Sequence, residues 1–334
     1  MAQKKIRVVQ YGCGPIGCRV ASYALERPNL ELVGAIGRVS NVGRDLGEVA
    51  GLGKKIGIII SNKPEEVFAK TKPDVVLHTT SSSLVKVQPE INQIVSAGIN
   101  VVSTTEELSY PWRQQPKISR EIDALAKKKK VTVLATGVNP GFVMDTWPLN
   151  LTAVCKEVKK VRVVRYQDAT TRRGPFQKKI GAGLTLAEFQ KKVDEGTLRH
   201  VGLTESIGMI AGGLGWELDD IKETLEPMIA QKEAKSEFVT VKPGQAMGVR
   251  QTGVGFRKGE EVIRLDFEAA VGRGETYDAV YITGTPNLEM VVRGGIHGDI
   301  ATAAIAVNAI YKVVDAPPGL LTMKDIPLVT CFTG

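Results

Sequence analysis

A glycine-rich turn near the N-terminus restricts the possible folds of this chain more than any other feature. The apolar run 6–11 reads as a short strand, and it is followed directly by Gly12-Cys13-Gly14-Pro15-Ile16-Gly17. A helix is predicted over about 15–25, because proline suits the first turn of a helix. In that context the three glycines permit a tight turn, close approach of a pyrophosphate, and close packing of helix on strand. We therefore expect the turn to bind the phosphates of a dinucleotide at the helix N-terminus, rather than to be merely a tight turn.

The first half of the chain alternates between apolar runs and amphipathic stretches. Further strands are predicted at 31–36, 56–60, 74–78, 100–103 and 131–135, and helices at 64–70, 84–97 and 118–129. Runs of Val and Ile that alternate with helices indicate a parallel sheet covered on both faces. The fold class predicted for residues 1–146 is therefore α/β, a doubly wound Rossmann sheet.

The end of the second predicted strand is where a Rossmann domain distinguishes NAD from NADP. An acidic residue there binds the ribose 2′-hydroxyl and favours NAD. This chain instead has Arg38, Ser40 and Asn41 in that stretch, and no carboxylate before Asp45. We predict that these residues bind a 2′-phosphate, so that NADP is the preferred cofactor and NAD the alternative one. The competing interpretation is that Arg38 is an ordinary solvated loop residue.

Composition and charge exclude several classes of function. The net charge is +8, but Lys and Arg are spread along the chain and only 5% of residues are aromatic, so no nucleic-acid partner is predicted. The four cysteines have neither disulfide nor zinc spacing and the three histidines are dispersed, so no metal is expected. Neither a signal peptide nor a membrane-spanning run is present, and reduced thiols indicate a cytoplasmic protein without a membrane partner.

The pattern changes after Trp147. A strand is predicted at 158–166, helices at 185–195, 204–211 and 218–230, and strands at 237–241, 247–257, 262–271, 277–282 and 288–292. Many of these strands fit antiparallel pairing, which indicates an α+β domain with an open-faced sheet over residues 147–297. The helix predicted at 298–313 and the tail 314–334 are expected to pack back on the first domain.

Four segments, spread over nearly the whole chain, carry a family resemblance. They are the glycine turn, Ser103-Thr104-Thr105-Glu106-Glu107-Leu108-Ser109-Tyr110-Pro111, Thr136-Gly137-Val138-Asn139-Pro140-Gly141-Phe142-Val143-Met144-Asp145 and Arg293-Gly294-Gly295-Ile296-His297-Gly298-Asp299. In these segments the chain resembles the dihydrodipicolinate reductase-like oxidoreductases, and most of all their 2,4-diaminopentanoate dehydrogenase and native amine dehydrogenase group. The resemblance implies a Rossmann domain joined to an open-faced sheet domain that binds the substrate and dimerises.

The resemblance also implies an NAD(P)-dependent amine dehydrogenase, which converts an amine to a ketone plus ammonia and catalyses the reverse reductive amination. Candidate substrates are 2,4-diaminopentanoate and simple amines, and a homodimer is expected. True dihydrodipicolinate reductases carry a His-His-x-x-Lys-type segment beside a Ser-Gly-Thr-Ala turn, and this chain has neither. Two alternatives stay open: reduction of an imine or double bond in a cyclic substrate, and a redox sensor that binds NADP without turnover.

Two adjacent carboxylates, Glu106 and Glu107, follow the fifth predicted strand. They are expected near the cofactor, because ligands gather at the carboxyl ends of the strands of a doubly wound sheet. Amine dehydrogenation passes through an iminium and a carbinolamine, and a carboxyl group can serve as the general acid and base that interconvert them. Its charged form also stabilises the cationic iminium. We assign the catalytic role to Glu106, nearer the strand end, and expect one of the two to serve only a helix N-terminus.

Further candidate ligands lie in the loops after the fourth, fifth and sixth strands. Their polar groups are predicted to contact the ribose and nicotinamide, although the serines also suit a helix cap. The predicted cofactor ligands of these loops are Thr79, Thr80, Ser81, Thr104, Asn139 and Pro140. Asn139 is also a candidate substrate ligand, and Phe142 either walls the substrate site or is a core aromatic residue. His78 is interpreted as a packing residue at a strand end rather than a catalyst.

The second domain is expected to contribute further substrate ligands. Arg165 and Tyr166 end its first predicted strand, where Arg165 either pairs with a substrate carboxylate or is only a charge at a strand edge. His200 is a weaker candidate. His297, between glycines, either lines the substrate site or has a structural role in its turn. The open sheet is expected to bury its uncovered face against a second copy of the chain.

Overall fold

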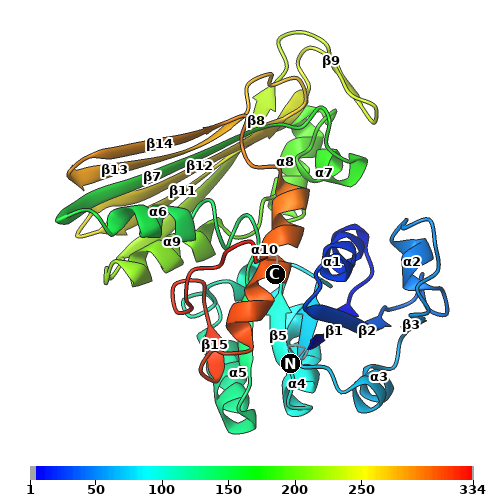
Figure 1. The fold of residues 1–334 in the computed structure, drawn as a ribbon. Coiled ribbons are helices and arrows are strands. Elements are labelled where there is room, and N and C mark those ends of the chain that lie inside the picture. The colour runs from blue at the N-terminus through cyan, green and yellow to red at the C-terminus, as the bar shows by residue number, and fades with distance from the viewer. Residues whose placement is uncertain (1–4, 333–334) are drawn as a thin grey trace. The chain divides into compact units, whose positions relative to one another are not determined.

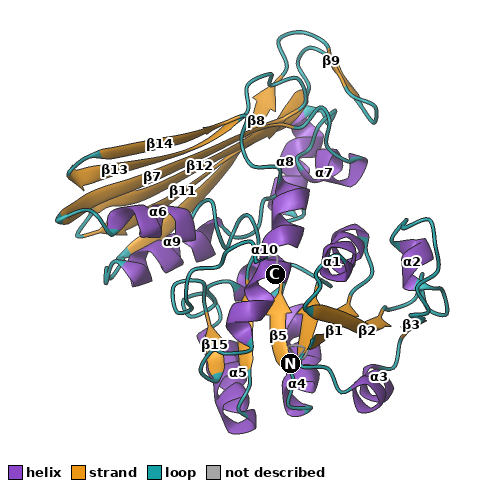
Figure 2. Cartoon of the chain, viewed as in Figure 1, coloured by secondary structure: helices purple, strands orange, loops and turns teal. Residues whose placement is uncertain are grey.

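The computed structural model describes residues 5–332 of the chain, and these fold as two compact units. Unit 1 contains the described residues up to Phe142 and from His297 onward, and unit 2 contains Val143–Ile296 (Figure 1). Each unit has its own large sheet, and Figure 2 distinguishes the helices from the strands. Among the described residues, no helix is both long enough and apolar enough to cross a membrane.

Both crossings between the units differ slightly from the predicted boundaries. The first crossing precedes Asp145, because this residue is buried within unit 2 and accepts a hydrogen bond from Ser206 Oγ (2.7 Å). The second crossing precedes His297, which is the N-cap residue of the last helix of unit 1. His297 therefore belongs to the first unit and not, as expected from the sequence, to the second.

Unit 1 alternates strands with helices. Its strands are β1 (Ile6–Tyr11), β2 (Leu30–Ile36), β3 (Ile60–Ser61), β4 (Val75–His78), β5 (Asn100–Ser103), β6 (Thr132–Ala135) and β15 (Gly319–Leu321). Its helices are α1 (Pro15–Leu25), α2 (Leu46–Val49), α3 (Pro64–Thr71), α4 (Leu84–Ser96), the 3-10 helix η1 (Glu106–Leu108), α5 (Pro116–Lys129) and α10 (Gly298–Val313). β3 is shorter than predicted, because the amides of Ile56 and Gly57 donate to the carboxylate of Asp45 (3.0 and 2.8 Å).

The strands of unit 1 form one parallel sheet in the order β15-β6-β5-β4-β1-β2-β3, which is the doubly wound order of a Rossmann fold. Helices α4 and α5 pack side by side over the face that carries Val9, Val76 and Val133. Helices α1 and α10 pack on one another and on β4, and α10 also packs on β5 and β6. The return of α10 to this sheet agrees with the prediction, and burial on both faces explains the continuous apolar runs of the strands.

Unit 2 is built on long antiparallel strands. Its strands are β7 (Glu157–Asp168), β8 (Asp220–Ile229), β9 (Ala234–Lys235), β10 (Thr240–Val241), β11 (Ala246–Arg257), β12 (Glu260–Ala270), β13 (Tyr277–Thr285) and β14 (Leu288–Arg293). Its helices are α6 (Thr146–Thr152), α7 (Gly174–Lys179), α8 (Leu186–Asp194) and α9 (Leu203–Gly213). Six strands form a mixed sheet in the order β14-β13-β7-β12-β11-β8, in which β7 and β12 are parallel, while β9 and β10 pair separately.

Most of the segment 218–230 is strand β8 and not the predicted helix. β8 pairs with β11 from end to end as the edge strand of the sheet. Ile221 and Leu225 share one side of the chain in a strand as well as in a helix, so their spacing favours neither structure. Pro227 lies inside the segment, and proline is compatible with an edge strand but not with a helix interior.

The two faces of the unit 2 sheet differ in chemistry. One face packs against α9, where Gly253 and Gly255 of β11 leave room for Ile207. The other face carries ion pairs to two acidic residues of β12. These pairs are Arg162–Asp266 (2.8 Å), Arg264–Asp266 (2.9 Å), Arg250–Glu268 (2.7 Å) and Arg273–Glu268 (3.0 Å). The side chains of Arg162 and Arg250 are 45% and 53% exposed, so this face is open within the chain.

Candidate functional site

The loops that follow β1, β4, β5 and β6 lie along one edge of the unit 1 sheet. These four strands are adjacent and parallel, so their carboxyl ends meet at the same edge. In a doubly wound sheet this edge is where ligands bind, at the point where the strand order reverses, and here that point lies between β1 and β4. The glycine turn follows β1, and residues 79–83 follow β4, so these two loops flank that point.

The glycine turn is shaped for the close approach of a ligand. Gly12 has φ +98°, and a Cβ there would lie 2.6 Å from the carbonyl oxygen of Thr79. A Cβ on Gly17 would lie 1.8 Å from the carbonyl oxygen of Gly12, so α1 can start this close to β1 only with glycine. Gly14 faces open space and is the N-cap of α1, and no side chain caps that helix. The start of α1 therefore lacks a capping side chain, which is compatible with a helix N-terminus that binds a phosphate group.

Two side chains hold the glycine turn in place. Gln10 lies near the end of strand β1. Its Nε2 donates to Thr79 Oγ1 (2.8 Å) and to the carbonyl oxygen of Gly12 (2.9 Å). Asn41, in the loop after β2, donates from Nδ2 to the carbonyl oxygen of Cys13 (3.1 Å). Gln10 is fully buried and was not identified in the sequence analysis. The available signal was a single amide side chain inside the apolar run of β1.

The predicted 2′-phosphate ligands lie in the exposed loop after β2. Arg38 forms an ion pair with Glu90 of α4, with NH2 2.6 Å from Oε1, and its side chain is 61% exposed. Ser40 is exposed, and Asn41 contacts the glycine turn as described above. Glu90 was not recognised from the sequence, because an isolated glutamate in an amphipathic helix reads as a solvated residue.

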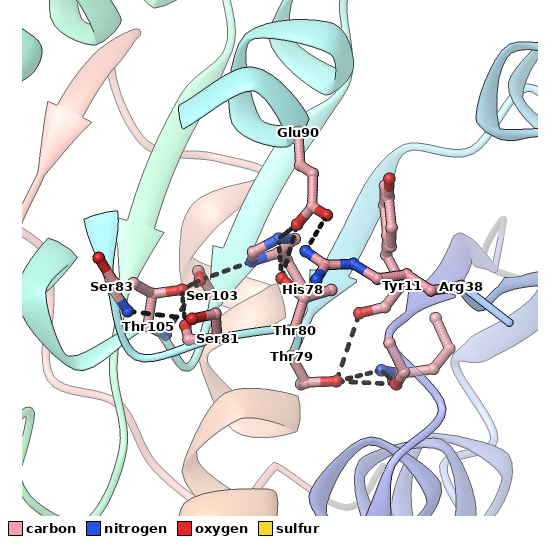
Figure 3. Close-up of polar contacts among 12 residues, drawn as sticks. Tyr11, Arg38, His78, Thr79, Thr80, Ser81, Ser83, Glu90, Ser103 and Thr105 are labelled. Atoms are coloured by element: carbon pink, nitrogen blue, oxygen red, sulfur yellow. Dashed lines mark hydrogen bonds and ion pairs between the residues drawn. The ribbon is translucent and has the colours of Figure 1, made fainter. Parts of the chain in front are cut away.

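His78, the last residue of β4, is at the centre of a buried polar network (Figure 3). Its Nε2 lies 2.9 Å from Glu90 Oε2 and 2.9 Å from Thr80 Oγ1, and its Nδ1 lies 3.0 Å from Ser103 Oγ. The ring is fully buried and packs edge-on against Tyr11. His78 is therefore a packing residue at a strand end, as expected, but it is also hydrogen-bonded at both ring nitrogens.

Glu90 is ionised over the whole neutral and mildly acidic range. Burial acts to raise the pKa of its carboxyl group, but hydrogen bonds from His78, Thr80 and Arg38 outweigh burial and lower the pKa to about 2. Burial, with a smaller contribution from the same carboxylate, raises the pKa of Tyr11 to about 12. A permanent negative charge thus lies behind Arg38 on the side of the protein interior.

The loop after β5 begins with hydroxyl groups and continues into η1. Thr105 Oγ1 accepts a hydrogen bond from Ser103 Oγ (2.9 Å) and donates to the carbonyl oxygen of Ser81 (2.9 Å). The amide of Thr104 donates to the carbonyl oxygen of His78 (2.9 Å). These bonds tie the loop after β5 to the loop after β4, directly before the first glutamate.

The two glutamates of this loop have different surroundings. Oε2 of Glu107 accepts a hydrogen bond from the amide of Leu84 (2.8 Å), the first residue of α4, and its own amide donates to the carbonyl oxygen of Ser82. Glu107 therefore stabilises the N-terminus of α4, which is the structural role expected for one of the pair. Glu106 is half-buried at the start of η1.

The loop after β6 is buried and tightly folded. Asn139 and Pro140 are joined by a cis peptide bond and are both buried. A Cβ on Gly141, which has φ +121°, would lie 2.4 Å from the amide nitrogen of Gly137. Phe142 is half-buried, so it belongs neither to the fully buried core nor to the exposed surface. These residues lie at the same edge of the sheet as the glycine turn.

Arg165 and Tyr166 have different surroundings in unit 2. They are consecutive residues of a strand, so their side chains point to opposite faces of the sheet. Arg165 lies on a central strand, not at an edge, and is buried with NH1 3.0 Å from Asp278 Oδ2 and NH2 2.8 Å from the carbonyl oxygen of Ile296. The guanidinium group of Arg273 covers the ring of Tyr166 on the open face (4.1 Å).

The two histidine candidates lie in different units. In unit 2, the ring of His200 stacks on Phe267 (4.5 Å), and its backbone exchanges two hydrogen bonds with the side chain of Gln251. Burial lowers the pKa of His200 well below its ordinary value, and Lys179 and Arg165 act in the same direction, so the ring is neutral at pH 7. In unit 1, His297 is exposed.

Other features of the described residues supply no second site. No group of three or more His, Cys, Asp or Glu side chains among residues 5–332 is placed to hold a metal ion. A hollow of about 730 Å³ in unit 1 is lined by Phe68, Gln93 and Ile99, among others. It lies where the chain enters β4 and β5, at the edge opposite the glycine turn.

Two family models together match almost the whole chain. The model of the 2,4-diaminopentanoate dehydrogenase C-terminal domain matches residues 142–334, which is more than half of the chain. The model of the dihydrodipicolinate reductase N-terminus matches residues 6–137. The change from one model to the other falls close to the first crossing between the two units.

Individual relatives give the same result. The chain is 36% identical to a 2,4-diaminopentanoate dehydrogenase of Acetoanaerobium sticklandii over 99% of this chain and 96% of the relative. It is 28% identical to an amine dehydrogenase of Streptomyces virginiae, over 97% and 96% of the two chains. Among solved structures, an amine dehydrogenase from Mycobacterium smegmatis superposes with a TM-score of 0.87 at 27% identity and covers 98% of each chain.

Proposed function

The chain belongs to the 2,4-diaminopentanoate dehydrogenase family and is an oxidoreductase that acts on amines, and on that premise we propose that it prefers NADP and deaminates 2,4-diaminopentanoate or a similar short amine. One observation supports this proposal best: the glycine turn and the loop that contains Glu106 lie at the same edge of one parallel sheet. The overall reaction converts an amine, water and the oxidised cofactor into a ketone, ammonium and the reduced cofactor.

The residues of unit 1 fit a nicotinamide dinucleotide. Gly12 and Gly17 have no room for a Cβ, and Gly14 leaves the start of α1 open to a phosphate. The other proposed cofactor ligands come from the loops after β2, β4, β5 and β6. They are Arg38, Ser40, Asn41, Thr79, Thr80, Ser81, Thr104, Asn139 and Pro140. The nicotinamide, when bound, accepts the hydride from the carbon atom that carries the amine.

Glu106 is the proposed acid and base of the reaction. In deamination its carboxylate takes a proton from the water that attacks the iminium carbon, and in amination its protonated form gives that proton to the departing hydroxyl group. The carboxylate also offsets the positive charge of the iminium. Glu107 is left out of this mechanism because its carboxylate is bonded to the N-terminus of α4.

The substrate is proposed from the relatives and from the chemistry of the candidate ligands. The higher identity to the 2,4-diaminopentanoate dehydrogenase, 36% against 28% for the amine dehydrogenase, favours an amine that also carries a carboxylate. Asn139 and Phe142 of the loop after β6 and His297 before α10 remain proposed substrate contacts from unit 1. Arg165 would have to exchange Asp278 for the substrate, so we rank it lowest.

The test is a turnover assay with the full chain, NADP and a panel that contains 2,4-diaminopentanoate and simple primary amines. Absorbance of the reduced cofactor should rise with at least one amine, and the reverse reduction of the ketone should require ammonia. Ketone reduction without ammonia would support the imine or double-bond reductase instead. Bound NADP with no turnover over the whole panel would support a sensor.

The NADP preference is tested by binding. Calorimetric titration of NADP and NAD should give tighter binding of NADP, and Arg38→Ala should weaken NADP much more than NAD, because arginine binds phosphate with a planar set of donors. Equal affinities in the unchanged protein, with no effect of Arg38→Ala, would refute the preference.

The dimer is proposed to form through the open face of the unit 2 sheet. Rows of arginine alternate there with Asp266 and Glu268, so two copies related by a two-fold axis can place opposite charges against one another. Light scattering should give twice the chain mass at micromolar concentration, and a monomer mass throughout would refute the proposal.

A further inference from the structure

Glu90 joins side chains from three separate elements of unit 1 (Figure 3). Its Oε1 is 2.6 Å from the guanidinium group of Arg38, and its Oε2 accepts a hydrogen bond from Thr80 Oγ1 (2.6 Å) and lies 2.9 Å from His78 Nε2. The side chain of Glu90 is 14% exposed, and that of Arg38 is 61% exposed. A carboxylate held inside the protein therefore contacts the residue that the proposed NADP preference depends on.

The hydrogen bonds around His78 hold its ring from both sides. Thr105 Oγ1 donates its proton to the carbonyl oxygen of Ser81, so Ser103 Oγ must donate to Thr105 and can only accept from His78 Nδ1. On the other side of the ring, Nε2 lies 2.9 Å from Glu90 Oε2 and 2.9 Å from Thr80 Oγ1. The ring is therefore held at both nitrogens, and it in turn fixes the position of the Glu90 carboxylate.

Arg38 uses only part of its guanidinium group to bind Glu90. The Glu90 carboxylate lies between the exposed Arg38 and the buried ring of His78. Because His78 is fully buried directly against Glu90, it fixes the carboxylate from the interior side. Arg38 contributes one nitrogen atom to Glu90, so its remaining donors stay available to an anion at the surface.

We propose that Glu90 is a positioning residue for cofactor selection, which is fixed by His78 and Thr80 and in turn orients Arg38 toward the 2′-phosphate of NADP. This inference rests on the proposed NADP preference and names the residue that makes Arg38 effective. A free arginine side chain must be ordered when the phosphate binds, and that ordering weakens binding. Glu90 orders the side chain beforehand.

The substitution Glu90→Gln separates this role from simple repulsion of the phosphate. An amide has one acceptor oxygen, which cannot serve His78, Thr80 and Arg38 together, so Arg38 is released. Loss of this ordering should raise the Kd of NADP about three- to tenfold, as expected for one long side chain immobilised on binding. The Kd of NAD should not change. If the charge of Glu90 mainly repelled the phosphate, NADP would bind more tightly to the variant, and that result would overturn the proposal.

The experiment is calorimetric titration of NADP and NAD into the full chain and four variants. These are Glu90→Gln, Arg38→Ala, the double variant, and the control Glu66→Gln, which removes the charge of a surface glutamate paired with Lys63. Introduced into the unchanged protein, Glu90→Gln should lower the ratio of NADP affinity to NAD affinity. Introduced into the Arg38→Ala variant, it should leave this ratio unchanged. The control should leave both affinities unchanged. Equal weakening of both cofactors by Glu90→Gln would indicate only structural damage and would also overturn the proposal.

The outcomes distinguish this inference from the NADP preference itself. If the unchanged protein prefers NADP and Arg38→Ala abolishes the preference while Glu90→Gln retains it, only the role of Glu90 fails. If the unchanged protein binds both cofactors equally and Arg38→Ala has no effect, the preference fails. Should Glu90→Gln not fold, Arg38→Lys replaces it, because a single ammonium group on a flexible stem cannot be ordered by Glu90 and pair with a phosphate as a planar guanidinium does. A full NADP preference in Arg38→Lys would count against the proposal.

Discussion

The two large sheets of this chain distribute their polar groups in opposite ways. In unit 1, strands β4, β5 and β6 are almost entirely buried on both faces, and polar side chains gather at the carboxyl ends of the strands. In unit 2, charged residues occur along the strands, with Arg165 and Asp278 buried on one face and rows of ion pairs on the other. The comparison shows that the first sheet carries its polar side chains at one edge, whereas the second sheet carries charged side chains on its faces.

The largest effect is expected at the edge of the first sheet. Glu106→Gln keeps the size of the side chain and removes its proton transfer, so kcat should fall about 10²- to 10⁴-fold. The Kd of NADP should stay unchanged, because the glycine turn holds the phosphates. Steady-state kinetics and calorimetry measure the two effects.

Glu107→Gln is the matched control for Glu106→Gln, since the two residues are adjacent and chemically identical. It should retain most of its activity and lose about 0.5–2 kcal/mol of unfolding free energy, because the carboxylate caps α4. A collapse of turnover in Glu107→Gln, with normal turnover in Glu106→Gln, would reverse the assignment. Normal turnover in both variants would remove the mechanism.

The next largest effect is a loss of stability that we expect when the buried ion pair of the second sheet is broken. Asp278→Ala leaves Arg165 buried without its counter-ion and should lower the unfolding free energy by about 3–5 kcal/mol. Replacing both residues by apolar ones, as in Arg165→Met with Asp278→Leu, should restore most of that loss. Chemical denaturation measures both variants. A folded double variant with a greatly increased KM would instead identify Arg165 as a substrate ligand.

A pH titration tests the network behind Arg38. The pKa of Glu90 is about 2 in the folded protein, below the ordinary 4.5, so its stabilisation is complete above about pH 4.5 and is lost as the pH falls toward 2. The loss amounts to about 3 kcal/mol of unfolding free energy. Urea unfolding at a series of pH values should show this decrease, and Glu90→Gln should remove it. An identical pH dependence in the variant would show that other carboxyl groups are responsible.

The smallest effect is expected on the open face of the second sheet. The side chain of Arg162 is 45% exposed, so Arg162→Ala should cost only about 0.2–1 kcal/mol in a single chain. If this face is the dimer interface, the same substitution should instead weaken the dimer measurably in sedimentation experiments. An unchanged dimer would place the interface elsewhere and leave the open face as an ordinary charged surface.

The fold of unit 1 was predictable because its signals are local. The continuous apolar runs, the amphipathic helical stretches and the glycine turn are each formed by residues that are adjacent in the sequence. In unit 2 the decisive signal is pairing between strands, and β8 pairs with β11, which follows it in the chain. The spacing of the apolar residues in 218–230 could not reveal that pairing, although Pro227 was a local signal against a helix interior.

The candidate site also contains some features that were predictable from the sequence and others that were not. The loops that contain the glycine turn and the two glutamates follow directly from the order of the strands. Glu90 and Gln10 were missed, because their roles depend on contacts with His78 and Thr79, which are distant in sequence. Arg165 was interpreted as a partner of a substrate carboxylate or as a charge at a strand edge, because the sequence could not show that Asp278, on the neighbouring strand β13, pairs with it.

The chain leaves unit 1 after Phe142 and returns at His297, so unit 2 is an insertion in the middle of the first unit. The last two elements, α10 and β15, complete the sheet that the first residues begin, since β15 pairs with β6 and α10 packs on α1 and β5. On the ribosome, where folding proceeds from the N-terminus, the first six strands of this sheet must therefore wait for α10 and β15 while the whole insertion is synthesised. The unit that is begun first is the last to be finished, so the face of β4, β5 and β6 that α10 covers lacks this cover until α10 has been synthesised.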